Sequence, residues 1–334
     1  MKRFKAAVVG CGNISRTHLP VLKAMQNIEL VAVCDTEPEK ALHCAEKYGC
    51  KAYYDFEALI SDENLDCVHL CTPHYLHVPM AVGALGKGIN VLCEKPCAIS
   101  RQSLDELGHA VAGSSAMFGV CFQNRYNAAV RETLRIIESG KFGSVTAERA
   151  DVDWFRDEAY YSDSWHGKKI SEGGGVLMNQ AIHTSDLLRV FAKSETQTVD
   201  AHVFNDTLKG VIDVEDSALV RYTYQNGVVA VLSATNGFSL NANVSIELFF
   251  ESGARLLLDG LDLYLTEGTG SFEKLRLENG GCCHGNSYWG NGHAALIEDF
   301  YRCVETGEHF PVDFEQGAKA VRDVLAAYES SQNC

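Results

Sequence analysis

Short apolar runs alternate with helix-like stretches through the first 122 residues, and this alternation constrains the fold more than any other feature. The apolar runs are candidate strands: Lys5–Gly10, Leu30–Cys34, Asp66–Cys71, Asn90–Cys93 and Ala116–Phe122. The stretches between them are candidate helices: Ser15–Met25, Glu37–Tyr48, Leu76–Gly86 and Ser100–Ala112. Short strands that alternate with helices predict an α/β fold with a doubly wound parallel sheet, because parallel neighbours need a crossover connection.

A glycine-rich turn follows the first candidate strand. Gly10 and Gly12 allow a tight turn and a close backbone approach, and Asn13 and Ile14 follow them at the start of a helix. A helix N-terminus behind such a turn is suited to a pyrophosphate group. The third glycine of a dinucleotide fingerprint is replaced by Ser15, which is small enough for close helix–strand packing. A glycine pair alone also fits an ordinary strand–helix turn.

Asp35 strengthens the dinucleotide interpretation. It ends the second candidate strand, at the distance where a carboxylate accepts hydrogen bonds from the ribose of an adenosine. A carboxylate there repels the 2′-phosphate of NADP, and no arginine follows in the next few positions. We therefore expect NAD rather than NADP. The alternative role for Asp35 is a helix cap, which Thr36 could supply instead.

Two further loops follow strands of the same predicted sheet, where ligands of parallel sheets bind. The first holds Thr72, Pro73, His74 and His77, and we expect it over the nicotinamide side of the cofactor. One of the two histidines would contact the cofactor while the other begins a helix, and we do not expect them to bind a metal. The second loop is Glu94-Lys95-Pro96, from which Lys95 can reach a substrate that lies on the cofactor.

The pattern changes after Arg125. Runs with partial apolar–polar alternation predict a mostly antiparallel sheet with one face covered by helices and the other face open. The runs are Ser144–Asp153, Thr198–Phe204, Ser217–Tyr224, Val228–Ala234, Val244–Phe250 and Ala254–Leu258. The candidate helices are Ala128–Glu138, Gly175–Phe191, Asn291–Glu305 and Glu315–Ser331.

Together the two patterns predict two domains. A dinucleotide-binding Rossmann domain would span 1–123, and a substrate-binding and oligomerisation α+β domain would span 124–334, its C-terminal helix free to pack back on the first domain. An open apolar sheet face is costly in water, so we expect a homodimer or homotetramer through that face.

Composition excludes several classes of partner. The net charge of -15, from 29 basic and 44 acidic residues, disfavours nucleic acid and anionic membranes. No apolar run is long enough to span a membrane, and many of the 13 cysteines lie inside apolar runs, so we expect a reduced, cytoplasmic protein. Cys282-Cys283-His284 has no second ligand pair at a suitable spacing, and we expect no metal site.

A glycine run and a histidine mark the second predicted domain. Gly173-Gly174-Gly175 opens a predicted helix, and we expect it to pack closely on bound cofactor or substrate. Asn179 and His183 lie four residues apart and hence on one face of that helix. Asp186 could orient the imidazole of His183 or pair elsewhere.

Taken together, these motifs resemble the Gfo/Idh/MocA family of oxidoreductases. The resemblance covers essentially the whole chain and rests on Gly10-Cys11-Gly12 with His18, Thr72-Pro73 with His77, Glu94-Lys95-Pro96, Gln123-Asn124-Arg125-Tyr126 and the block from Gly173 to Leu188. It implies a Rossmann domain, an open-faced oligomerising sheet, and a lysine and a histidine that act on a sugar or polyol. Those catalytic roles fall on Lys95 and His183, and Glu94 and Asn124 join the expected cofactor contacts.

The expected reaction is the reversible oxidation of a ring secondary alcohol of a carbohydrate or polyol. His183 would act as general acid/base, and Lys95 would stabilise the developing alkoxide. Inositol dehydrogenase-like members carry an aspartate where this chain has Asn179, so no proton relay can pass through that position, although Asn179 can still hold a substrate hydroxyl.

The loop before the glycine run supplies the remaining candidate substrate contacts: Trp154, Arg156 and Trp165, with Arg125 and Tyr126 from the earlier motif. Aromatic side chains among polar ones suit a pyranose, but they also suit a loop that packs on a sheet. Two alternatives remain: an enzyme that recycles tightly bound NAD through a transient keto sugar, for glycoside cleavage or epimerisation, and a non-catalytic NAD or sugar sensor.

Overall fold

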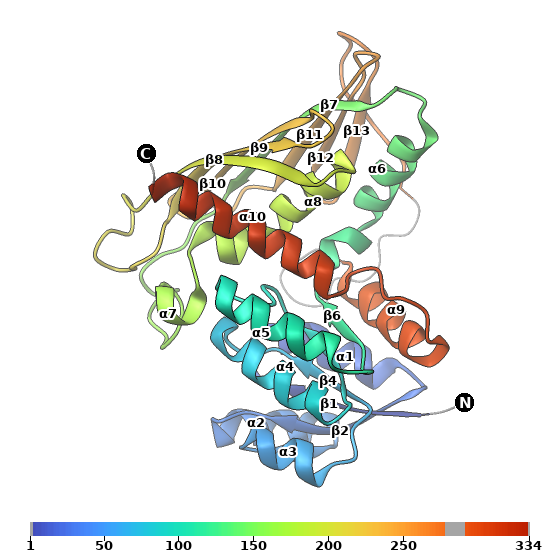
Figure 1. Ribbon diagram of the computed structural model, residues 1–334, viewed down its shortest axis with the longest axis vertical. Helices are drawn as coiled ribbons and strands as arrows, with labels where there is room; N and C mark the ends of the chain where they lie inside the picture. The colour runs from blue at the N-terminus through green and yellow to red at the C-terminus, as the bar shows by residue number, and fades with distance from the viewer. Residues whose placement is uncertain (1–2, 278–290, 333–334) are drawn as a thin grey trace. The chain divides into compact units, whose positions relative to one another are not determined.

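The computed structural model describes residues 3–277 and 291–332, and the chain divides into two compact units. Of the described residues, the first unit comprises 3–123 and 291–318, and the second comprises 124–277 and 319–332. Helix α10 (Phe314–Gln332) contributes its first residues, up to Ala318, to the first unit and the rest to the second. Figure 1 labels the helices and strands of both units.

The first unit is built on a six-stranded parallel sheet with strand order β3-β2-β1-β4-β5-β6. Its strands are β1 (Phe4–Val9), β2 (Ile28–Cys34), β3 (Lys51–Tyr53), β4 (Cys67–Leu70), β5 (Asn90–Cys93) and β6 (Phe118–Val120). The strand order reverses between β1 and β4, which is the switch point where dinucleotides bind to such sheets. The predicted doubly wound parallel sheet is therefore confirmed.

Helices pack on this sheet and bury most of the residues in its central strands. The helices of the unit are α1 (Ser15–Ala24), α2 (Pro38–Tyr48), α3 (Phe56–Asp62), α4 (His77–Gly86), α5 (Arg101–Ala112) and α9 (His293–Thr306), with a short 3-10 turn η1 (His74–Leu76) before α4. Helix α1 packs against α9, and α4 packs against α5 (Figure 1). Every residue of β4 is buried, as expected for a strand that is covered on both faces.

The second unit contains an eight-stranded sheet with strand order β14-β13-β12-β11-β7-β10-β9-β8. Its strands are β7 (Val145–Asp153), β8 (Thr196–Phe204), β9 (Ser217–Tyr224), β10 (Val229–Thr235), β11 (Ser245–Phe250), β12 (Arg255–Asp259), β13 (Asp262–Thr266) and β14 (Glu273–Lys274). All neighbours are antiparallel except β7 and β10, which run parallel. The predicted mostly antiparallel sheet is confirmed.

One face of this sheet packs against helices, and the other face carries exposed side chains in the described part of the chain. Helix α6 (Ala128–Ser139) packs on β12 and β13, and α8 (Ile182–Ala192) packs on β7 (Figure 1). Residues alternate accordingly along β9: Val220 and Tyr222 are buried, whereas Leu219, on the opposite face of the same strand, is 51% exposed. The short 3-10 turn η2 (Gln123–Tyr126) spans the point where the chain passes from the first unit to the second. The second unit also contains α7 (Lys169–Glu172) and the π-helical turn η3 (Leu177–Ala181).

Several elements differ from the sequence prediction. The helix expected over Gly175–Phe191 begins with the π turn η3, and only then continues as α8. Strands β3, β13 and β14 and helix α3 carry too short a pattern to be predicted, although Asp55 caps α3 by accepting the N–H of Ala58 at 2.8 Å. None of the helices in residues 3–277 and 291–332 combines the length and apolarity that crossing a bilayer requires.

Candidate active site

The glycine turn of the first unit has the geometry that a pyrophosphate needs. Gly10 has φ +90°, and a Cβ there would lie 2.4 Å from the carbonyl oxygen of Cys71, so only glycine fits. A Cβ on Gly12 would meet nothing within 4 Å, which leaves the space beside the turn open. Helix α1 begins after Ile14 without a side-chain cap, so its N-terminal N–H groups suit an anion.

Asp35, directly after β2, is hydrogen-bonded to this turn. Its Oδ2 accepts the N–H of Cys11 at 2.8 Å, and its Oδ1 accepts the N–H of Glu37 at 2.9 Å. The carboxylate is only partly buried, and each oxygen has a second lone pair with which a ribose hydroxyl could bond. No side chain caps α2, whose N-cap is Glu37, so Thr36 does not take the capping role.

The loop after β4 is braced by His77. The Nδ1 of His77 lies 2.7 Å from the carbonyl oxygen of Pro96, and its Nε2 lies 2.9 Å from that of Thr72. Burial lowers the pKa of His77, although both carbonyls oppose the shift. His77 begins α4 as expected, and its ring ties the Thr72 loop to the Glu94-Lys95-Pro96 loop.

The same loop offers a polar group to a ligand. The Oγ1 of Thr72 is buried and makes no hydrogen bond with the described residues. A buried hydroxyl of this kind costs free energy unless a ligand or water satisfies it. Pro73 is partly exposed beside it, and His74 is buried with its ring 5.8 Å from that of His77. Together with the turn at Gly10 and the carboxylate of Asp35, this loop fits a dinucleotide.

Lys95 is the one partly exposed side chain between Val91 and Ala98. Its backbone N–H donates to Oε2 of Glu94 at 3.3 Å, and the Oε1 of the same carboxylate lies 3.0 Å from Nε2 of His18. Burial opposes ionisation of Glu94, but His18 and His293 hold the pKa of this carboxyl well below its usual range. Glu94 is thus a buried anion next to Lys95, and the residue is only 4% exposed.

In the second unit, η3 and α8 present His183 from an otherwise buried helix. Only His183 and Val190 are partly exposed among the residues of α8. The carboxylate of Glu215 caps the start of the η3–α8 segment: its Oε2 accepts the N–H of Gly175 at 2.8 Å, and its Oε1 accepts the N–H of Leu177 at 3.0 Å. Burial raises the pKa of Glu215, and the N–H donors only partly offset it.

The glycine run has a different partner from the one expected. A Cβ on Gly174 would lie 1.9 Å from the hydroxyl of Tyr328, and a Cβ on Gly175 would lie 1.8 Å from the carbonyl oxygen of Glu215. Gly174 and Gly175 therefore make room for Tyr328 and Glu215 of this chain, and a contact of the glycine run with cofactor or substrate stays a prediction.

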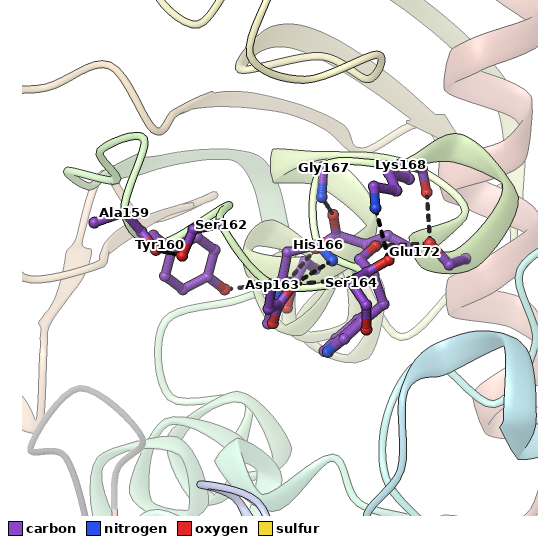
Figure 2. Close-up of polar contacts among 12 residues, drawn as sticks. Ala159, Tyr160, Ser162, Asp163, Ser164, His166, Gly167, Lys168 and Glu172 are labelled. Carbon is purple, nitrogen blue, oxygen red and sulfur yellow. Dashed lines mark hydrogen bonds and ion pairs between the residues drawn. The ribbon is translucent and has the colours of Figure 1, made fainter.

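Asn179 lies in the π turn η3 and donates from Nδ2 to Oε1 of Glu172 at 2.5 Å. The Oε2 of Glu172 accepts the N–H of Gly167, also at 2.5 Å (Figure 2). A carboxylate is therefore present beside Asn179, although none stands at position 179 itself. Asn179 also lies 3.4 Å from the hydroxyl of Tyr160, which links the helix to the aromatic loop.

Asp186 pairs with arginines. Its carboxylate accepts two hydrogen bonds from Arg125, at 2.7 and 2.6 Å, and one from Arg189 at 2.8 Å. Burial alone would raise the pKa of Asp186, but Arg125 and Arg189 outweigh it and the pKa is lowered. Of the two roles open to Asp186, the structure shows pairing, and Arg125 is an anchor of α8 within the second unit.

The loop between β7 and α7 gathers aromatic and charged side chains. The guanidinium of Arg156 lies 5.0 Å from the ring centres of both Trp154 and Tyr160. Trp154 and Arg156 are buried, whereas Tyr160 is partly exposed. Arg156 also donates to Oδ1 of Asn241 at 2.8 Å. Trp154 and Arg156 thus form the buried part of the loop and hold it in place through these contacts.

Farther along the loop, His166 and Asp163 form a dyad that sequence reasoning did not single out (Figure 2). The Nδ1 of His166 lies 2.5 Å from Oδ2 of Asp163, and the N–H of His166 donates to Oδ1 of Asp163 at 2.9 Å. The ring of Trp165 lies 3.7 Å from the imidazole and that of Tyr160 lies 4.7 Å from it. Trp165 and His166 are partly exposed, so they can reach a ligand.

Three other predicted residues lie in η2, close to the point where the chain passes from the first unit to the second. Asn124, Arg125 and Tyr126 belong to η2, where Oδ1 of Asn124 accepts from Asn127 at 3.3 Å and the ring of Tyr126 lies 4.9 Å from the guanidinium of Arg131. The Cys282-Cys283-His284 segment lies outside the described residues. The sequence did not predict the roles of Glu172, which accepts a hydrogen bond from Asn179, and of Glu215, which caps the segment that carries His183. The only sequence signal for Glu172 is its position directly before the glycine run.

Similarity to known proteins agrees with this geometry. Residues 4–122 match a family profile described as an oxidoreductase family with an NAD-binding Rossmann fold, and residues 130–255 match the GFO/IDH/MocA C-terminal domain. Levoglucosan dehydrogenase of Pseudarthrobacter phenanthrenivorans is 24% identical over 95% of this chain and 93% of its own length. Myo-inositol 2-dehydrogenase of Thermotoga maritima is 24% identical over 98% of this chain and 96% of its own length.

A solved structure shares the fold. The WlbA dehydrogenase from Bordetella pertussis, in complex with NADH and UDP-GlcNAcA, has a TM-score of 0.85 at 24% identity, covering 99% of this chain and 97% of that one. Because two profiles of one family match successive parts of the sequence, and because the glycine turn and Asp35 have the geometry of a dinucleotide site, the chain belongs to the Gfo/Idh/MocA family of oxidoreductases and carries its NAD-binding Rossmann domain.

Proposed function

We propose that this protein is an NAD-dependent dehydrogenase that moves a hydride between a ring secondary alcohol of a sugar, cyclitol or sugar derivative and nicotinamide. One observation carries this proposal above the others. His183 and Val190 are the only partly exposed residues of the otherwise buried helix α8, and of the two only His183 can transfer a proton. The named relatives that act on levoglucosan and myo-inositol support the substrate class.

We assign the cofactor to NAD. The proposed contacts are Gly10, Gly12, Asn13 and Ile14 for the pyrophosphate, Asp35 for the ribose, and Thr72, Pro73, His74, His77, Glu94, Lys95 and Asn124 for the remainder. Among them, Asp35 decides between the two dinucleotides, because its partly exposed carboxylate would repel a 2′-phosphate. Bound NAD supplies the hydride acceptor, and the protein supplies binding, orientation and proton transfer.

Two residues carry the proposed proton chemistry. His183 takes the hydroxyl proton as general base and returns it in the reverse direction. Lys95 stabilises the negative charge that develops on the substrate oxygen, as a preorganised donor does in a site with little water. Asn179 cannot take up a proton, and its Nδ2 already donates to Glu172, so its proposed role is to position a substrate hydroxyl.

We place the sugar against the aromatic loop of the second unit. Trp165 is partly exposed, and an apolar ring face of a pyranose can stack on such a side chain while its hydroxyls bond to polar neighbours. Trp154 and Arg156 are buried and would act by supporting the loop. Arg125 is held by Asp186, so its contribution, with that of Tyr126, is to fix the segment that leads into the second unit.

We also propose that the open face of the eight-stranded sheet joins copies of this chain. Leu219 on β9 and Val231 on β10 are 51% and 45% exposed on that face. Large apolar side chains that share an open sheet face are typical of an interface.

The test is the formation of reduced nicotinamide by purified protein with excess NAD, across inositols, hexoses, uronates, glycosides and nucleotide sugars. Turnover with one class, lost in His183→Ala and in Lys95→Ala, is the expected result. A panel without turnover, with NAD already bound to the purified protein, would instead favour the enzyme that recycles its cofactor. A panel without turnover, without bound NAD and without thermal stabilisation by NAD would overturn the assignment.

A further inference from the structure

Asp163 and His166 form a dyad in the second unit that the proposed reaction does not use. The Oδ2 of Asp163 lies 2.5 Å from Nδ1 of His166, and its Oδ1 accepts the backbone N–H groups of His166 at 2.9 Å and of Trp165 at 3.1 Å (Figure 2). Burial opposes ionisation of Asp163, but the hydrogen bonds from His166 and Trp165 outweigh it and the pKa of Asp163 is lowered. The dyad therefore joins an ionised carboxylate to one nitrogen of an imidazole.

The carboxylate fixes the roles of the two ring nitrogens. An ionised carboxylate only accepts hydrogen bonds, so Nδ1 of His166 carries a proton whether the ring is neutral or charged. The Nε2 lies on the other side of the ring and points away from Asp163. It is the nitrogen that gains or loses a proton, and the hydrogen bond to Asp163 sets this assignment.

Aromatic side chains hold the ring of His166 in place. The ring centre of Trp165 lies 3.7 Å from that of His166, and the ring centre of Tyr160 lies 4.7 Å from it. The side chain of His166 is nevertheless 17% exposed. Its orientation is set before any ligand arrives, so a ligand that bonds to it has little side-chain motion to arrest.

Glu172 ties this ring to the residue that we propose to position a substrate hydroxyl. Its Oε2 accepts the N–H of Gly167, the residue after His166, at 2.5 Å (Figure 2). Its Oε1 accepts from Nδ2 of Asn179, also at 2.5 Å. Because one buried carboxylate holds both donors, the backbone next to His166 lies beside the side chain of Asn179.

Tyr160 makes a second connection between the same two places. Its hydroxyl lies 3.4 Å from Nδ2 of Asn179 and 3.5 Å from Nε2 of Gln180 in η3, and its ring packs on that of His166. His183 follows Asn179 by four residues. Two sets of contacts within the second unit thus place the dyad beside the segment that carries the proposed acid–base residue.

A hydroxyl is the substrate group that Nε2 of His166 suits best. A hydroxyl can donate to a neutral ring and accept from a charged one, so it bonds to the ring in either state. An anionic substituent would meet the carboxylate of Asp163 close behind the ring, and like charges repel. The dyad therefore favours a neutral polyhydroxylated ligand.

We propose that His166, oriented by Asp163, is a substrate-binding residue whose Nε2 hydrogen-bonds a second hydroxyl of the substrate, distinct from the one that is oxidised. The inference rests on the sugar site of the proposed function and deepens it, because the substrate must then carry at least two free hydroxyls. A site built to bond a hydroxyl strongly rejects the analogue that lacks it, since the polar group of the protein is left unpaired. His166 is thus a determinant of specificity.

Nitrogen NMR of the histidine rings tests binding without turnover. Protein with and without NADH is titrated with inositols, hexoses, uronates, glycosides and nucleotide sugars, and His166→Gln assigns the signal. We expect a proton on Nδ1 of His166, and we expect at least one neutral sugar to shift its Nε2 signal while the signal of the exposed His202 stays in place. An Nε2 signal that no compound of the panel moves overturns the proposal.

Deoxy analogues test what the hydrogen bond does. For a sugar that turns over, each hydroxyl except the reacting one is removed in turn, and we expect one analogue to lose about 100-fold or more in kcat/KM. His166→Ala should lower kcat/KM of the parent sugar by a similar factor and change that of this analogue less than about threefold. His166→Gln, whose amide can replace Nε2, should restore part of the loss. An equal loss for the parent and every analogue would show a merely structural role and overturn the proposal.

These measurements separate the inference from the proposed function. A sugar that shifts the His166 signal without forming reduced nicotinamide from NAD would contradict the dehydrogenase and support the site. Turnover that His166→Ala leaves at wild-type values for every sugar would contradict the site and support the dehydrogenase. His202→Ala on β8 is the matched control, and we expect it to behave as the wild type in both measurements.

Discussion

At the scale of single residues, His183 is the side chain on which the proposed chemistry depends most. Replacing it with asparagine keeps a polar group of similar size but removes the acid–base nitrogen. We expect kcat to fall by about 100- to 10,000-fold, the usual contribution of a positioned acid–base group, with little change in KM or in NAD binding. Steady-state kinetics and a thermal shift with NAD measure both.

The matched control for this prediction is His202→Asn, because His202 is exposed on β8 of the same unit. We expect its kcat to equal that of the wild type. A His183→Asn enzyme with wild-type kcat would show that another residue transfers the proton, and the dyad of His166 and Asp163 would then be tested first.

Glu148 makes a separate prediction about stability. Its carboxyl lies on the covered face of β7, is 3% exposed, and neither oxygen has a hydrogen-bond partner in the described part of the chain. Burial raises the pKa of Glu148 well above its ordinary value of 4.5. Above pH 4.5 the unfolded chain releases a proton that the native state retains, so this group makes the protein less stable as pH rises.

Glu148→Gln removes that pH dependence. We expect the variant to melt higher than the wild type at pH 8, by about 3 °C for each roughly 1 kcal/mol gained, and to lose this advantage near pH 5. Thermal unfolding across pH measures the difference. The control is Glu273→Gln on the exposed strand β14. A difference between Glu148→Gln and the wild type that does not change with pH would contradict the assignment.

At the scale of elements, the position of α8 depends on the contact between Gly175 and the backbone of Glu215. An alanine at 175 would place its Cβ 1.8 Å from that carbonyl oxygen, so η3 and the start of α8 must move. We expect Gly175→Ala to lower the free energy of unfolding by about 1–3 kcal/mol. A shift of about 1 Å at Asn179 and His183 would lower kcat by about 100-fold.

Gly86→Ala is the matched control for the helix glycine. A Cβ at Gly86 in α4 would meet nothing within 4 Å, so we expect it to stabilise the protein by about 0.4–1 kcal/mol through the unfolded state. Denaturant unfolding and kcat are measured for both variants. A Gly175→Ala enzyme with wild-type stability would show that Glu215 yields easily and that the contact does not set the position of α8.

Local patterns determine how much of these elements the sequence could predict. The strand and helix order of the first unit was readable because each short apolar run was followed by a helical period. The π turn η3 was not readable, because it depends on Glu215, which lies 40 residues after Gly175 and accepts its N–H. Likewise, Glu94 was predicted as a motif residue, but its contacts with His18 and His293 arise only from the fold.

At the scale of the whole molecule, the open face of the eight-stranded sheet predicts the state of assembly. Leu219 and Val231 stand on neighbouring strands β9 and β10, and their exposed area is removed from water if a second copy covers this face. We expect the double variant Leu219→Lys with Val231→Glu to dissociate into single chains, as measured by light scattering. Leu42→Glu on α2 is the matched control, because Leu42 is 46% exposed in the first unit, and we expect it to leave the assembly intact. If the double variant keeps the mass of the wild-type assembly, the sheet face is not the interface, and if the wild type is already a single chain, the prediction of an oligomer is wrong.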